Sequence, residues 1–319
     1  MLDKKNFYIN GKWVSPEEPR NYKVIDPSNE EPCAEISLGG KKDVDKAVSA
    51  AKKAFETWAF TKKEERLELL EKLYVIYKKR WAEMAKLISL EMGAPIKFST
   101  EMQAATGAGH IKSFKQILKD FKFEKDLGEE KNNQKLLYEP KGVCALITPW
   151  NWPINQVNLK VIPALASACT VVLKPSEIAP LSSMLLAEMI DEAKFPSGVF
   201  NLLNGDGAIT GNALTSHPDI NMISFTGSTR AGALISQNAA KDFKRISLEL
   251  GGKGANIIFK DADPEAVARG VLRCFRNSGQ SCNAPTRMLV EKSIYDKTVE
   301  KVKELANNTK VDAPQKEGD

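Results

Sequence analysis

The spacing of hydrophobic residues changes along the chain, and the change predicts which elements form where. Up to about residue 140, apolar residues recur every three or four positions, which is typical of amphipathic helices. We expect one helix from Asp43, its N-cap, through residues 44–55, and a second over 63–90 that Gly93 and Pro95 close. The first 140 residues are therefore expected to be mainly helical.

Residues 141–250 follow a different pattern, in which short continuous apolar runs alternate with helical spacing. The runs predict strands over 143–148, 170–173, 199–203, 221–225 and 245–250. Helices are expected between them, at about 154–168, 181–194, 208–216 and 231–240. Repeated units of this kind predict an α/β fold with a doubly wound, Rossmann-like parallel sheet. Continuous apolar runs also predict strands that are buried on both faces.

A second α/β unit begins after residue 250. We expect a strand over 255–259, then a helix that Asp263 opens with Pro264 in its first position. A strand over 288–290 and a helix over 294–305 follow. This stretch is short for a domain, and a parallel sheet that starts here has few strands left to pair with. The sequence therefore predicts an incomplete second domain.

Composition and charge exclude several classes of protein. The chain has 319 residues and a net charge of +5, and its basic residues form no block, so no nucleic-acid partner is expected. Five widely spaced cysteines argue against a disulfide scaffold and for a reducing compartment. With two histidines, no metal site is expected. Because neither a secretory signal nor a membrane span is visible, we expect a soluble, cytoplasmic protein.

Several segments that follow predicted strands carry groups suited to a nucleotide. Ligands of doubly wound sheets bind at the carboxyl ends of the strands. Lys174 and Glu177 follow a buried strand, where a carboxylate can accept hydrogen bonds from ribose hydroxyls and repel a 2′-phosphate. Residues 227–232 precede a helix whose free amides could bind a diphosphate. A helix start at Glu177 and a plain turn and cap at 227–232 are the alternatives.

Three further side chains could carry covalent chemistry. Cys282 lies in a small, polar, turn-forming segment, unlike Cys144 and Cys169 in their apolar runs, and accessible thiols are the reactive ones. Glu249 ends a strand before two glycines and is a candidate general base. Asn151 lies in a proline-stiffened loop and could donate to an oxyanion. The alternatives are inert packing, a strand-end charge and a turn asparagine.

Taken together and in this order, the motifs resemble the aldehyde dehydrogenase superfamily. The resemblance extends from the opening segment Tyr8 to Trp13 to the last residue, and five motifs carry it. They are residues 149–153 (Pro149-Trp150-Asn151-Trp152-Pro153), 173–177 (Leu173-Lys174-Pro175-Ser176-Glu177), 225–229 (Phe225-Thr226-Gly227-Ser228-Thr229), 248–253 (Leu248-Glu249-Leu250-Gly251-Gly252-Lys253) and 277–282 (Asn277-Ser278-Gly279-Gln280-Ser281-Cys282) with Arg287.

The resemblance implies an oxidoreductase that converts an aldehyde to a carboxylic acid with NAD, in preference to NADP. Cys282 would form the thiohemiacetal and thioester, Asn151 would stabilise the oxyanion, and Glu249 would activate the hydrolytic water. The residues implied to contact the cofactor are Thr148, Pro149, Trp150, Lys174, Glu177, Gly207, Gly211, Phe225, Gly227, Ser228, Thr229, Gly232 and Leu250.

The substrate is expected to be a small-molecule aldehyde of unspecified identity. Positions that match the family's substrate tunnel are Trp152, Gln156, Leu159, Arg276, Ser281 and Asn283. Two other functions stay open at this point. One is an acylating aldehyde dehydrogenase that uses coenzyme A, although such relatives often lack the base that Glu249 would supply. The other is a non-catalytic nucleotide-binding remnant.

The resemblance also implies a domain division. Residues 1–120 and 142–250 would form the NAD-binding domain, residues 121–141 part of an oligomerisation hairpin, and residues 251–319 an incomplete catalytic domain. The family's chains continue further, so we expect a C-terminally truncated fragment that is weakly active or inactive alone. The full-length protein is expected to be a homodimer or homotetramer without a membrane partner.

Overall fold

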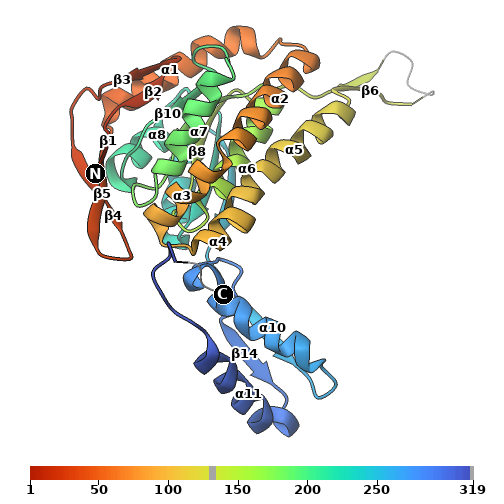
Figure 1. Cartoon of the computed structure of the whole chain (residues 1–319). Coiled ribbons are helices and arrows are strands. Elements are labelled where there is room, and N and C mark those ends of the chain that lie inside the picture. The colour runs from red at the N-terminus through yellow and green to blue at the C-terminus, as the bar shows by residue number, and fades with distance from the viewer. Residues whose placement is uncertain (129–133, 317–319) are drawn as a thin grey trace.

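The computed structural model describes residues 1–128 and 134–316. A large α/β body contains most of the chain, and a smaller unit with the last strands and helices lies beside it (Figure 1). The tail then returns to the large body, where the amide of Ile96 donates to the carbonyl of Pro314 at 2.7 Å. The nucleophile predicted at Cys282 therefore lies in a segment that is connected to the large body both before and after it.

A seven-stranded sheet forms the centre of the large body. Its order is β12 (Arg245–Leu250), β11 (Met222–Gly227), β8 (Val143–Ile147), β9 (Thr170–Lys174), β10 (Phe200–Leu202), β2 (Phe7–Ile9) and β3 (Lys12–Val14). The first five strands are parallel, and β2 and β3 are antiparallel to their neighbours. The predicted doubly wound parallel sheet is therefore confirmed.

Helices cover both faces of this sheet and create two hydrophobic cores. One core lies mainly between β8, β9 and β10 and a first set of helices, and the other lies mainly between β8, β9 and β11 and a second set. The first set is α2 (Lys63–Lys79), α3 (Trp81–Met92), α5 (Ala104–Asp120), α6 (Pro153–Ala166) and α7 (Leu181–Glu192); the second is α1 (Lys41–Trp58), α8 (Asn212–Ser216) and α9 (Thr229–Ala240).

Burial of the strands differs from the expectation at one edge. Strands β8 and β9 are buried at every position, as their continuous apolar sequences predict. In β12, however, exposed and half-buried residues alternate, and the exposed set includes Ser247 and Glu249. Strand β12 lies at the end of the sheet with one face uncovered, so the prediction that every strand is buried on both faces is wrong there.

The N-terminal region contains more strand than its sequence indicates. Besides β2 and β3, strands β1 (Leu2–Lys4), β5 (Glu31–Ser37) and β4 (Asn21–Asp26) form a second sheet in that order. The expectation of a mainly helical first 140 residues is wrong for this part. Strands of three residues are too short to display a period of two. Whether such a segment forms a strand therefore depends on pairing with partners far away in the chain.

Two predicted helices in this region also need correction. Helix α1 begins after Gly40, and Asp43 occupies its third position, where its carboxylate accepts from the Gly40 amide at 2.9 Å. The expected helix over 63–90 is divided into α2 and α3 at Arg80, whose backbone leaves the helical region (φ −100°, ψ 17°). Gly93 closes α3 in the left-handed conformation (φ 74°), as predicted.

Short irregular helices complete the large body near the proposed chemistry. A short helix, α4 (Ile96–Phe98), leads into a π-helical turn (Ser99–Gln103) and then directly into α5. The helix expected over 208–216 is instead a π-helical turn (Gly207–Gly211) followed by α8. Strands β6 (Glu124–Asp126) and β7 (Lys135–Leu137) pair as a projecting hairpin (Figure 1). Part of the oligomerisation hairpin predicted at 121–141, residues 129–133, lies outside the described residues.

The smaller unit begins after β12. Strand β13 (Ala255–Ile258) pairs in parallel with β14 (Arg287–Val290), and α10 (Pro264–Phe275) and α11 (Tyr295–Asn308) accompany them. Two 3₁₀ turns, Arg276–Gly279 and Lys292–Ile294, precede β14 and α11. Asp263 caps α10 and Pro264 is its first residue, as predicted. Over residues 1–128 and 134–316, the helices are too short or too polar to cross a membrane.

Candidate active site and cofactor cleft

A cavity of about 450 Å³ opens at the carboxyl edge of the parallel sheet. Five of the residues implied to contact a nucleotide line it: Lys174, Gly207, Gly211, Phe225 and Ser228. The sequence did not single out the other lining residues, which are Ile147, Ala208, Asn212, Thr215, Arg230, Ala231, Leu234, Ile235 and Asn238. Most of them lie on α8 and α9, where helical spacing alone does not separate a cavity wall from ordinary packing.

The lysine of this cavity is held by backbone oxygens. Lys174 is 3% exposed, and its Nζ donates to the carbonyls of Pro175 at 2.9 Å and Gly205 at 2.5 Å. The Glu177 carboxylate lies 3.5 Å from the same Nζ. Burial lowers the pKa of Lys174, while the negative charge of Glu177 opposes that change. Lys174 and Glu177 therefore meet beside the cavity, although only Lys174 lines it.

The glycine-rich start of α9 combines capping with close packing. Ser228 is the N-cap, and its Oγ accepts from the amide of Ala231 at 3.2 Å, so the predicted cap is present. A Cβ on Gly232 would lie 2.8 Å from Leu250 Cδ2, so glycine permits α9 to approach β12. Ser228 thus faces the cavity, whereas close packing against Leu250 accounts for Gly232.

The structure brings Asn151 and the segment before Cys282 together, although they are far apart in the sequence. The Asn151 Nδ2 donates to the Gln280 carbonyl at 2.9 Å, across 129 positions of the chain. The Trp152 indole also donates to the Ser281 hydroxyl at 2.8 Å. Cys282 follows directly and is exposed to solvent. An accessible thiol in a segment that a side-chain amide holds in place is suited to nucleophilic attack on a carbonyl.

Glu249 lies at the carboxyl end of β12, on the same edge of the sheet as the Asn151 loop. It is exposed and stands in register with Thr226 of β11. Among the described residues, no hydrogen bond or ion pair joins it to Cys282. Glu249 therefore lies at the expected edge of the sheet, without a hydrogen bond or ion pair to Cys282 in the part of the chain that the structure describes.

A buried lysine beside β11 is a feature that sequence reasoning did not use. Lys160 of α6 is 7% exposed, and its Nζ donates to the Ser224 hydroxyl at 3.2 Å. Burial lowers the pKa of Lys160 to about 8, while the charge of Glu249 acts in the opposite direction. The signal in the sequence was a single lysine that interrupts the apolar face of a helix.

The remaining predicted contacts lie near the cavity without lining it. Thr148 extends the β8–β9 pairing, because its amide donates to the Lys174 carbonyl at 3.2 Å. The implied cofactor residues that do not line the cavity are Thr148, Pro149, Trp150, Glu177, Gly227, Thr229, Gly232 and Leu250. Cys144 and Cys169 are buried, as their apolar sequence context predicts.

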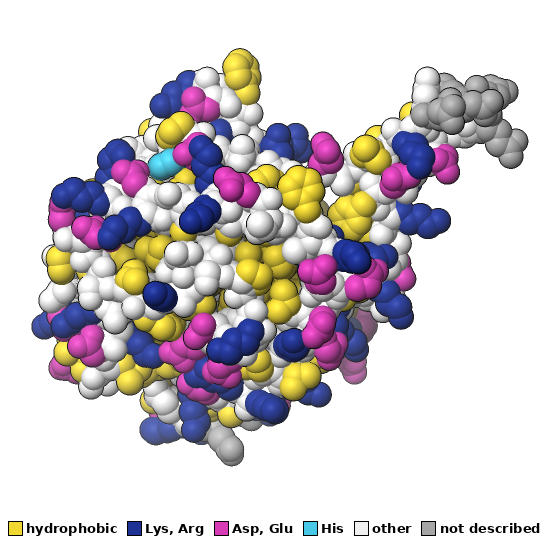
Figure 2. All heavy atoms as spheres, turned by 90° about the horizontal axis from the view of Figure 1, so that it is seen from above, with side chains coloured by type: hydrophobic (Ala, Val, Ile, Leu, Met, Phe, Trp, Pro, Cys, Tyr) yellow, Lys and Arg dark blue, Asp and Glu magenta, His cyan; other side chains and the backbone are white. Residues whose placement is uncertain are grey.

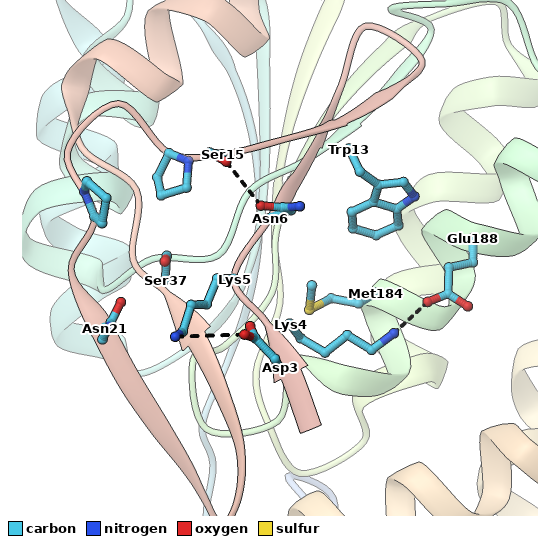
Figure 3. A pocket seen from close by; sticks show the side chains of 12 residues that line it. Asp3, Lys4, Lys5, Asn6, Trp13, Ser15, Asn21, Ser37, Met184 and Glu188 are labelled. Atoms are coloured by element: carbon cyan, nitrogen blue, oxygen red, sulfur yellow. Dashed lines mark hydrogen bonds and ion pairs between the residues drawn. The ribbon is translucent and has the colours of Figure 1, made fainter. Parts of the chain in front are cut away.

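A second cavity, of about 580 Å³, lies between the N-terminal segment and α7 (Figure 3). Lys4 pairs there with Glu188 at 2.8 Å, and Lys5 lies 3.9 Å from Asp3. Since each of these charges is already paired, the cavity offers no uncompensated charge to a ligand. On the face of the molecule seen from above, basic and acidic side chains are likewise interspersed (Figure 2).

Comparison with known proteins agrees with this geometry. The sequence pattern of the aldehyde dehydrogenase family matches residues 13–319. A 3-succinoylsemialdehyde-pyridine dehydrogenase from a Pseudomonas species is 52% identical over 93% of this chain, which spans 62% of that relative's length.

Solved structures give the same result. A crystal structure of aldehyde dehydrogenase from Bartonella henselae has a TM-score of 0.98 at 60% identity, covering 100% of this chain and 67% of that one. A mutant of aldehyde dehydrogenase C from Pseudomonas syringae, in complex with NAD⁺ and octanal, has a TM-score of 0.94 at 45% identity, covering 97% and 63%. The chain belongs to the aldehyde dehydrogenase family.

Proposed function

We propose that this chain is part of an enzyme that oxidises an aldehyde to a carboxylic acid with NAD, through a covalent intermediate on Cys282. The contact between the Asn151 amide and the Gln280 carbonyl carries the proposal, because Gln280 stands only two residues before the exposed Cys282. The cavity that Lys174 and Ser228 line at the same edge of the sheet supplies a site of suitable chemistry for a nucleotide.

The chemistry of the chain's own residues follows from these positions. The Cys282 thiolate attacks the carbonyl carbon and forms a carbon–sulfur bond, and Asn151 Nδ2 donates to the resulting oxyanion. NAD, when bound, supplies the hydride acceptor that makes the step from thiohemiacetal to thioester an oxidation. Glu249 then takes a proton from water, the hydroxide attacks the thioester carbonyl, and the Cys282 thiolate leaves as the acid is released.

The preference for NAD over NADP rests on Glu177. Its carboxylate lies 3.5 Å from Lys174 Nζ, at the edge of the cavity, and is partly accessible to solvent. A carboxylate in this position can accept hydrogen bonds from ribose hydroxyls and repels a 2′-phosphate. The identity of the aldehyde is left open, since the relatives' names include a pyridine semialdehyde dehydrogenase and a betaine aldehyde dehydrogenase.

Low activity of the 319-residue chain by itself remains our prediction. Cys282 and Glu249 are both exposed, so bulk water would surround the reacting groups instead of a closed site. Robust production of NADH from simple aldehydes by this chain would contradict the prediction.

We also propose a homodimeric or homotetrameric complete protein, supported by the exposed apolar side chains Leu136, Leu137 and Tyr138 near the projecting hairpin. Five free cysteines support a cytoplasmic location.

Alkylation of Cys282 tests the proposal without requiring turnover. Iodoacetamide labelling, followed by mass spectrometry of the peptide that contains Cys282, is expected to slow when NAD is added. The variant Lys174→Met is the matched control, since it removes the amine that lines the cavity and is expected to shift the effect of NAD to higher NAD concentrations. Equal rates with and without NAD in the unmodified chain would refute the proposal. A requirement for coenzyme A in turnover by the longer protein would instead indicate the acylating reaction.

A further inference from the structure

A buried glutamine stands behind the segment that carries the proposed nucleophile. Gln103 is the last residue of the π-helical turn before α5 and has no exposed surface. Its Nε2 donates to Asn277 Oδ1 at 2.6 Å, across 174 positions of the chain, and lies 3.4 Å from the Asn151 carbonyl. Gln103 thus connects the large body to the Asn151 loop and to Asn277, which lies in the segment before Cys282.

Its partner, Asn277, is the centre of the hydrogen-bond network. Asn277 is 2% exposed, and its Nδ2 donates to the Asn151 carbonyl at 2.9 Å and to the Gln280 carbonyl at 3.0 Å. The Gln280 carbonyl also accepts from the Asn151 side chain. One side-chain amide therefore fixes the spacing between the Asn151 loop and the residues just before Cys282.

The orientation of this amide depends on Gln103. A side-chain amide donates from its nitrogen and accepts at its oxygen. Because Gln103 presents a donor to Asn277 Oδ1, the Nδ2 of Asn277 is directed toward the two carbonyls. With the opposite orientation, Oδ1 would face those carbonyl oxygens and both hydrogen bonds would be lost. The donor on Gln103 thus decides whether Asn277 can hold the segment.

The backbone of this segment needs such support. Asn277 and Ser278 have φ values of 56° and 54°, in the left-handed region that residues other than glycine adopt rarely. Such conformations persist where surrounding contacts determine them. A further contact of this turn is exposed, since the Ser278 hydroxyl donates to the Gly93 carbonyl at 3.3 Å at an exposed position.

We propose that Gln103 is a positioning residue for the nucleophile: it orients the amide of Asn277 and so holds residues 277–282 against the Asn151 loop. The meaning of this role for catalysis rests on the proposed function, but the role itself is structural and can be measured without turnover. A general packing role for Gln103 would stabilise the whole core, whereas a positioning role acts on this segment alone.

The variant Gln103→Glu separates the two roles because it keeps the shape and changes the donor. An ionised carboxylate has no donor for Asn277 Oδ1, whereas a protonated one offers an O–H. Burial raises the pKa of a carboxyl group, so the introduced acid is expected to take up its proton as the pH falls from 9 to 6. Gln103→Leu lacks the donor at every pH. Gln116→Glu makes the same change at an exposed position of α5 and serves as the control.

Hydrogen–deuterium exchange of the peptide that covers residues 276–283 is the measurement, with each variant compared to the unmodified chain at the same pH. A hydrogen bond that involves a charged or buried partner contributes enough that its loss is expected to accelerate exchange roughly tenfold or more. Gln103→Glu is expected to show this at pH 9 and to approach the unmodified chain at pH 6. Gln103→Leu is expected to show it at both pH values.

Unchanged exchange at 276–283 in both Gln103 variants would overturn the proposal, and so would equal acceleration throughout α5 and β8. If the Gln103 variants do not fold, Asn277→Asp tests the second step of the proposal, because it keeps an acceptor for Gln103 but removes the Nδ2 that donates to both carbonyls. Unchanged exchange at 276–283 in that variant would also overturn the proposal. Failure of the proposed function has a different signature. In that case NAD has no effect on the alkylation of Cys282, whereas the exchange results stand.

Discussion

Replacement of Glu91 by glutamine is expected to change how the stability of the protein depends on pH. The Glu91 carboxyl is 1% exposed and lies at the start of α7, where it accepts from the amides of Leu181 and Ser182, the latter at 3.1 Å. Burial raises its pKa from 4.5 to about 7, although these hydrogen bonds oppose the change. The folded protein therefore holds this proton over a pH range in which the unfolded chain has released it.

The size and sign of the effect follow from this difference. A tenfold change in proton affinity corresponds to about 1.4 kcal/mol. Moving the pKa from 4.5 to about 7 thus costs about 3 kcal/mol once the group is ionised in both states. The folded pKa is the higher one, so the contribution of Glu91 is fully present below pH 4.5 and is lost as the pH rises through about 7.

Urea denaturation of the unmodified chain and of Glu91→Gln, at pH 4.5 and pH 8, measures this difference. Glutamine loses one acceptor for the α7 amides, and that loss is the same at both pH values. The free energy of unfolding of the unmodified chain, relative to the variant, is expected to fall by about 3 kcal/mol from pH 4.5 to pH 8. Glu101→Gln, at an exposed position nearby, is the control. A relative stability that does not change with pH would refute the reasoning.

Three further outcomes are expected. Iodoacetamide is expected to label Cys282 at least about tenfold faster than Cys144, because only the former is accessible; peptide mass spectrometry measures both rates, and equal labelling would contradict the description of the site. Lys174→Met is expected to weaken NAD binding by roughly tenfold or more, since a charged donor is lost; fluorescence titration measures this, and unchanged affinity would exclude Lys174 from the cofactor site. Gly107→Ala is expected to lower the free energy of unfolding by about 1–3 kcal/mol, because the new Cβ would lie 2.4 Å from the Tyr77 hydroxyl; urea denaturation measures it, and an unchanged midpoint would show that the core can adjust.

Much of the fold could be predicted because the relevant signals are local. The predicted strand over 245–250 has the observed bounds of β12, and Pro264 begins α10 as expected. Gly93 ends α3 because a left-handed residue follows the last helical turn. In each case the sequence within a few residues determines the backbone, through apolar continuity, a fixed φ or the absence of a Cβ.

Other features depended on partners far away in the chain. Arg80 divides a helix whose sequence is continuous, and its guanidinium forms ion pairs with Glu83, Glu188 and Glu192. Strand β2 exists because it pairs with β10, although its three residues have no distinctive pattern. Neither feature has a signal that a window of neighbouring residues could reveal.

The sequence by itself determined the doubly wound sheet and the candidate residues Asn151, Glu249 and Cys282. It also determined the strand ends at which Asn151 and Glu249 lie. Only the tertiary structure decided that Gln103 contacts Asn277 and that Lys160 is buried near Glu249. The physical reason is that local propensities depend on residues adjacent in the chain. Hydrogen bonds across more than a hundred positions form only after packing of the whole body has fixed both partners.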